Sequence, residues 1–170
     1  MPGLIGFQLI LLSVAEKRTL VLGLGNEILS DDGIGPRLVK DLTGMFDSPQ
    51  LEFKTVSLGG LEVMELLTGF DKAVLIDAIH TRDGKPGTVY YFSPSDFRET
   101  SNLSNLHDVS FLTALRLART LDLNIPSDLY IIAVEIYEDL VFSENLTPVL
   151  NRKYSGTLKK VHEILKEILN

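Results

Sequence analysis

The chain has no cysteine among its 170 residues, which excludes disulfide scaffolds, thiolate metal sites and cysteine nucleophiles. Any catalysis must therefore use oxygen or imidazole groups. Phosphate-loop, His-Glu-x-x-His and Gly-x-Ser-x-Gly motifs are absent as well, and most familiar hydrolase classes are excluded with them. The absence of cysteine is compatible with a reducing compartment, and we expect a cytoplasmic protein.

Positive charge is scarce, because 16 Lys and Arg residues are set against 23 Asp and Glu residues, for a formal net charge of −7. Such a chain repels polyphosphate, so we expect no nucleic-acid partner. The hydrophobic fraction of 45% and the charged fraction of 23% are typical of globular proteins. A chain of this length fits a single core, which predicts one domain over residues 1–170.

The apolar start of the chain, Met1 to Ala15, has no Lys or Arg ahead of it, although a signal peptide usually carries such a charge. At roughly 15 residues it is also short for a membrane span. We therefore expect no membrane span and interpret residues 1–17 as an extension, with secretion as the alternative.

Strand-like and helix-like segments alternate from residue 19 to the end of the chain. Short β-prone runs predict strands at 19–23, 51–58, 73–76, 88–92 and 129–134. Apolar residues at helical spacing predict helices at about 36–46, 61–67, 108–121 and 147–169. This alternation predicts an α/β fold in three layers, with a mostly parallel or mixed sheet of about five strands and helices on both faces.

Carboxylates follow two of the predicted strands, at the strand ends where open α/β sheets usually bind ligands. Asp31 and Asp32 follow the first strand, and Asp77 directly follows the apolar run 73–76. One aspartate in a loop is often only a turn or helix cap. Asp77, however, comes after four aliphatic residues and needs a cation, a metal or several donors. We therefore expect a functional site at this edge.

Three histidines are available as further ligands. His80 lies three residues past Asp77 and could compete for a metal, whereas His162 is predicted to be solvated on the polar side of the last helix. His107 precedes the helix predicted from about residue 108. Alone it would more often be a surface residue, but two carboxylates with one histidine suit a divalent transition metal with open coordination positions.

Gly23-Leu24-Gly25 is similar to the start of a dinucleotide-binding fingerprint. The third glycine of that fingerprint would fall at position 28, which is Ile28. No organic cofactor is therefore expected.

The segment from Gly23 to Gly35, GLGNEILSDDGIG, strongly resembles the opening signature of the nickel-iron hydrogenase maturation endopeptidases. The resemblance continues in order through Gly59-Gly60, Ile76-Asp77-Ala78 and Leu106-His107-Asp108, and spans residues 19 to 165. It implies an endopeptidase, aspartic-type by family classification, that removes the C-terminal extension of the nickel-loaded large-subunit precursor. It also implies that Asp32, Asp77 and His107 form the catalytic site and contact nickel carried by the substrate.

The chain departs from the family pattern in two places. Ser57-Leu58 precede the double glycine where an aspartate is common, and the stretch from Val134 to Glu138 lacks the usual glycine. These departures bear on the substrate groove and on which hydrogenase is recognised. They leave the three proposed contacts unchanged.

Two other functions fit part of the pattern. Peptidyl-tRNA hydrolases also open with Gly-Leu-Gly-Asn, but they continue with proline and glycine where Glu27-Ile28 stand here. A non-catalytic metal-binding or partner-binding module would keep the three residues and lack hydrolysis. Whether a carboxylate activates water is left open, with Asp31 the nearest additional candidate for a general base.

Overall fold

The computed structural model describes residues 17–57, 61–93, 96 and 117–170. Four sequence predictions therefore lie wholly or mostly outside the described residues: the extension over residues 1–17, the turn at Gly59-Gly60, the start of the helix near Asp108, and the position of His107.

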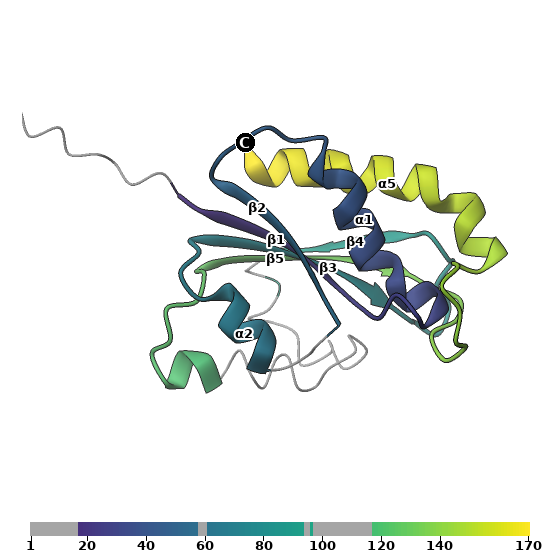
Figure 1. Ribbon diagram of the computed structural model, residues 1–170, viewed down its shortest axis with the longest axis horizontal. Helices are drawn as coiled ribbons and strands as arrows, with labels where there is room; N and C mark the ends of the chain where they lie inside the picture. Colours follow the sequence, from purple (N-terminus) through teal and green to yellow (C-terminus); the bar gives the residue numbers. More distant parts are fainter. Residues whose placement is uncertain (1–16, 58–60, 94–95, 97–116) are drawn as a thin grey trace, which may run out of the picture.

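A five-stranded sheet forms the centre of the described structure (Figure 1). Its spatial order is β2-β1-β3-β5-β4, and every neighbouring pair is parallel except β4 with β5. The strands are β1 (Thr19–Leu24), β2 (Leu51–Val56), β3 (Lys72–Ile79), β4 (Val89–Phe92) and β5 (Asp128–Glu135). This arrangement confirms the predicted mixed sheet.

Helices cover both faces of the sheet (Figure 1). On one face, α1 (Ile34–Thr43) and α5 (Pro148–Leu169) bury apolar side chains against β1, β3 and β5. On the other face, α2 (Leu61–Leu67) and a helical turn at 117–120 pack over a second apolar cluster. The three-layer α/β prediction is confirmed. Across the described ranges, no helix is both long enough and apolar enough to cross a membrane.

Two predicted boundaries were wrong in ways that concern the site. The strand predicted at 73–76 extends over Lys72–Ile79, so Asp77 lies within β3 and pairs with Ala133 of β5. Main-chain hydrogen bonding continues past the charge because it does not depend on side-chain polarity. The first helix begins at Ile34, after a 3₁₀ turn at Ser30–Gly33, and ends at Thr43.

His162 differs from its prediction as well. It is half-buried, and its ring centroid lies 5.1 Å from that of Phe46. The imidazole thus packs at the edge of the core between α5 and the segment after α1, because an aromatic body and a polar tip suit such a boundary.

Candidate functional site at the carboxyl edge of the sheet

Asp32 is presented by the loop and 3₁₀ turn that follow β1. The main-chain N–H of Asn26 donates to Asp32 Oδ2 at 2.6 Å, which fixes the half-buried carboxylate across the loop. Gly25 makes this close approach possible, since its φ is 134° and a Cβ there would collide with the Asp32 carbonyl oxygen.

Asp77 is half-buried within β3, and its Oδ1 accepts from the N–H of Ala78 at 2.8 Å. Side chains alternate along a strand, so Asp77 lies on the same face as Leu75 and Ile79. Both of these neighbours belong to the apolar cluster under α2. The carboxylate therefore lies within that apolar row, between Leu75 and Ile79, two residues before β3 ends at Ile79.

The sheet order and the start of α1 bring these two aspartates to the same edge. β1 and β3 are parallel neighbours, with Gly23 opposite Ile76, and the 3₁₀ turn carrying Asp32 contacts β3. Gly35 packs directly against the carbonyl oxygens of Leu24 and Ile76, leaving no room for a Cβ. The first turn of α1, which begins two residues after Asp32, is thus pressed against the main chain beside Asp77.

His107, the third residue expected in the site, lies outside the described residues. Within the described ranges, no three His, Cys, Asp or Glu residues form a cluster that could hold a metal ion. His80 is exposed in the loop after β3.

Asp31 has a different place from its neighbour Asp32, because its side chain is fully buried. Its Oδ2 accepts from the N–H groups of Tyr137 at 3.1 Å and Glu138 at 3.3 Å. Thr147 donates to the same carboxylate twice, from its N–H at 2.7 Å and from its hydroxyl at 2.8 Å. The carboxylate joins the β1 loop to the segment between β5 and α5, so the interpretation of Asp31 as a spare general base is wrong.

Glu135, like Asp31, is a buried carboxylate that joins two segments of the chain. It is 1% exposed at the end of β5, and it accepts from Thr81 through the N–H at 2.7 Å and the hydroxyl at 2.9 Å. Gly84 lies so close that a Cβ would collide with the Glu135 carboxyl group. Burial raises the pKa of Tyr90, and the nearby Glu135 carboxylate contributes to that increase. Glu135 therefore holds the loop that carries His80.

Sequence reasoning missed the structural roles of Asp31 and Glu135. The donors to Asp31 lie 106 to 116 residues further along the chain, and Thr81 lies 54 residues before Glu135. No local pattern could have indicated these pairs. A usable signal was the presence of a carboxylate directly after buried aliphatic residues, as in Val134-Glu135, which requires donors.

The described edge combines two half-buried carboxylates with a main chain held in one conformation. Carboxylates in such a setting can contact a cation, orient a peptide bond or accept a proton from water.

Comparison with known proteins places the chain in a family. Residues 36–165 match the family model described as hydrogenase maturation protease. That span includes Asp77 and His107 and begins after Asp32. The chain is also 29% identical, over 155 residues, to the hydrogenase 2 maturation protease of Escherichia coli K12, covering 88% of this chain and 92% of the relative.

Solved structures show the same fold. The hydrogenase maturating endopeptidase HybD from E. coli superposes with a TM-score of 0.67 at 26% identity, over 88% of this chain and 93% of that chain. The NiFe hydrogenase maturation protease HybD from Thermococcus kodakarensis has a TM-score of 0.63 at 23% identity, over 86% and 98% of the two chains. These matches support the endopeptidase interpretation over a peptidyl-tRNA hydrolase, and the chain belongs to the hydrogenase maturation protease family.

Proposed function

We propose that this protein removes the C-terminal extension from the nickel-loaded large-subunit precursor of a nickel-iron hydrogenase. The whole chain acts as one protease domain, with residues 1–17 as an extension, and it acts in the cytoplasm. The observation that carries the proposal is the position of Asp32 and Asp77 at one edge, brought together by neighbouring parallel strands and by Gly35.

In this proposal Asp32, Asp77 and His107 contact the nickel that the substrate carries. Carboxylate and imidazole groups suit a divalent transition metal, and a chain without cysteine leaves thiolate ligands to the substrate. Contact with the metal positions the scissile bond at the same edge, and such positioning lowers the barrier to reaction. No organic cofactor is needed.

Hydrolysis also requires that water attack the scissile carbonyl and give up a proton, and that the leaving amine gain a proton as the C–N bond breaks. The assignment as an aspartic-type enzyme gives this proton transfer to Asp32 or Asp77. Asp31 is unsuitable, because its buried oxygens already accept four hydrogen bonds.

The test is to incubate the protein with candidate large-subunit precursors, each prepared with and without nickel. We expect the nickel-loaded form of one precursor to lose a mass equal to its C-terminal tail, and the nickel-free form to remain intact. Equal cleavage of both forms would contradict the role of nickel. Binding without any cleavage would instead support a non-catalytic module.

A further inference from the structure

The segment that leaves β5 exposes large apolar side chains beside the proposed site. Leu140 and Phe142 are 82% and 80% exposed. Ile28 of the β1 loop, whose carbonyl accepts from the N–H of Ser143, is 49% exposed. We call the following residues the apolar patch: Ile28, Tyr137, Leu140, Val141 and Phe142. Clusters of exposed large apolar side chains commonly mark surfaces that bind another molecule.

The main chain under the apolar patch is held by hydrogen bonds from both sides. Ser143 donates to the carbonyl of Ile28 at 3.0 Å, and Ser30 donates to the carbonyl of Ser143 at 2.8 Å. Leu140 donates from its N–H to Glu138 Oε1 at 2.7 Å. A patch with a fixed shape loses little conformational entropy when it binds a partner.

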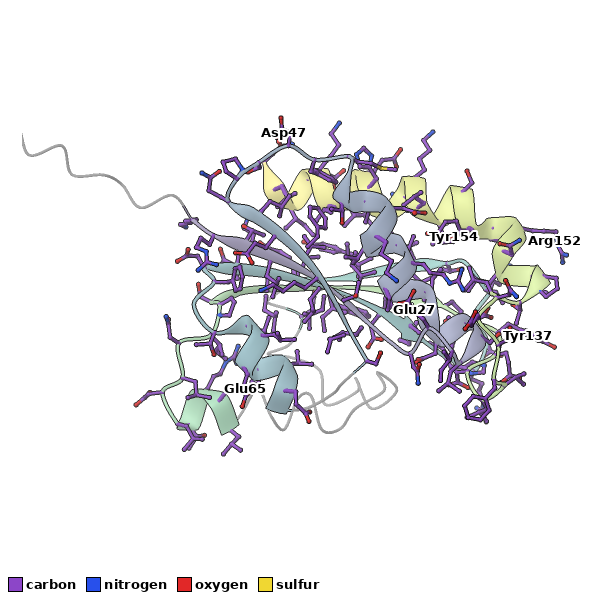
Figure 2. The ribbon with its side chains drawn as sticks, viewed as in Figure 1. Glu27, Asp47, Glu65, Tyr137, Arg152 and Tyr154 are labelled. Atoms are coloured by element: carbon purple, nitrogen blue, oxygen red, sulfur yellow. The ribbon has the colours of Figure 1, made fainter. Side chains whose placement is uncertain are left out.

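The apolar patch is also continuous with the proposed site. Asp31 fixes Tyr137 and Glu138 through its carboxylate, and Asp32 is the next residue in the chain. Figure 2 shows Tyr137 at the end of the molecule towards which β3 points. A protein substrate seated at Asp32 would therefore lie beside these side chains.

The charges around the apolar patch are mostly negative. Between Tyr137 and Thr147 the chain has Glu138, Asp139 and Glu144 and no Lys or Arg. Arg37 approaches from α1 and donates to the carbonyl of Glu144. A partner suited to this surface would combine apolar side chains with Lys or Arg around them.

We propose that the apolar patch docks a surface of the large-subunit precursor that is separate from its nickel site and has apolar side chains flanked by Lys or Arg. The proposal rests on the proposed function for the identity of the substrate. It assigns to the patch the recognition of the precursor, and to the aspartates the contact with nickel.

The experiment compares precursor cleavage by the full-length protein and by the double variant Leu140→Ser, Phe142→Ser. We expect KM to rise at least about tenfold, since truncation of central apolar contacts has effects of this size. We expect kcat to stay within about twofold, because neither side chain touches the reacting bond. The two single variants give the same test if the double variant folds poorly.

The matched control is the double variant Met45→Ser, Leu121→Ser. These side chains are 48% and 59% exposed. Met45 lies just after the end of α1. Leu121 lies close to Asn124, whose carbonyl accepts from the N–H of Gly69 just before β3 begins. Both side chains are therefore at the edge of the sheet opposite to the proposed site. We expect the KM of this control variant to equal that of the unmodified protein.

A second measurement separates the two proposals. Direct binding of the precursor to the unmodified protein and to both double variants is measured without reference to cleavage. One outcome is that the unmodified protein cleaves the precursor and that Leu140→Ser, Phe142→Ser has the same KM and the same affinity for it. This outcome would overturn docking and leave the proposed function intact. Binding that weakens in this variant, with no cleavage by any form, would overturn the proposed function alone.

Two further results bear on the partner. Glu144→Lys is expected to raise KM severalfold at low salt and to reduce its dependence on ionic strength, and an unchanged KM would overturn the charge match. If the unmodified protein is a dimer that Leu140→Ser, Phe142→Ser converts to monomer with KM unchanged, the patch joins two copies of this chain and docking is overturned.

Discussion

Neighbouring aspartates have opposite environments in this protein, although they share one 3₁₀ turn. Asp31 is buried and bonded to a distant segment, whereas Asp32 is half-buried at the edge of the sheet. Their difference arises because successive side chains of the turn point in different directions. Substitutions at the two positions should therefore have separable effects on stability and on activity.

At Asp32, replacement by Ala is expected to abolish precursor cleavage while the protein remains folded, since the half-buried carboxylate contributes little apolar packing. Asp32→Glu is expected to retain measurable activity, because under the proposed function a longer carboxylate can still reach the nickel carried by the substrate. Cleavage gels and thermal melts of both variants check this expectation. Asp47→Ala, at an exposed carboxylate beyond α1, is the control. Full activity in Asp32→Ala would remove Asp32 from the site.

At Asp31, replacement by Ala is expected to lower the free energy of unfolding by about 3 kcal/mol or more, since several buried donors lose their acceptor. This exceeds the loss of about 1 kcal/mol typical of a single helix cap. The urea midpoint measures the change. A loss below about 1 kcal/mol would show that water replaces the carboxylate.

Helix α1 is held close to the proposed site, because Gly35 in its first turn packs on the main chain of Leu24 and Ile76. Helix α5 instead supports the edge through Thr147, whose hydroxyl caps the helix by accepting from Leu150 and also donates to Asp31. Both helix starts therefore help to hold the loops that form the edge.

Gly35→Ala is expected to destabilise the protein by about 2–3 kcal/mol, since the new Cβ meets two main-chain carbonyls that cannot move independently. Precursor cleavage should fall with it, because α1 follows directly from Asp32. Gly156→Ala in α5 is the matched control, as a Cβ there meets nothing within 4 Å. That control should gain about 0.5–1 kcal/mol, the usual difference between alanine and glycine inside a helix. Urea unfolding of both variants tests the pair.

For the molecule as a whole, the proposed function brings the metal in with the substrate, and under that proposal the protein needs no metal of its own. We expect the free protein to bind nickel weakly, because two carboxylates and one imidazole leave coordination positions for the substrate's ligands. Equilibrium dialysis with and without precursor measures the difference. A stoichiometric zinc that resists chelation, and whose removal abolishes cleavage, would instead indicate an ordinary metallohydrolase.

Several features of this protein follow from local sequence alone. The alternation of apolar runs and helical stripes correctly predicted the α/β class and the helices on both faces. The family resemblance carried by the 23–35 segment is confirmed by the comparisons. Part of that segment is held by nearby contacts, such as Gly25 against Asp32. Local patterns suffice here because secondary structure and tight turns depend on neighbouring residues.

Other features depended on the tertiary structure, because they arise from pairing between segments far apart in the chain. The strand β3 continues past Asp77 because it pairs with β5 as far as Ile79. The antiparallel direction of β4 is set by its pairing with β5 at the edge of the sheet. Asp31 has a structural role because folding brings its donors, Tyr137 and Thr147, from a distant part of the chain. The apolar patch can be identified only from the exposure of its side chains, since Leu140 and Phe142 are exposed whereas the apolar residues of the core are buried. Short apolar runs look alike in sequence, and only packing decides which of them meet water.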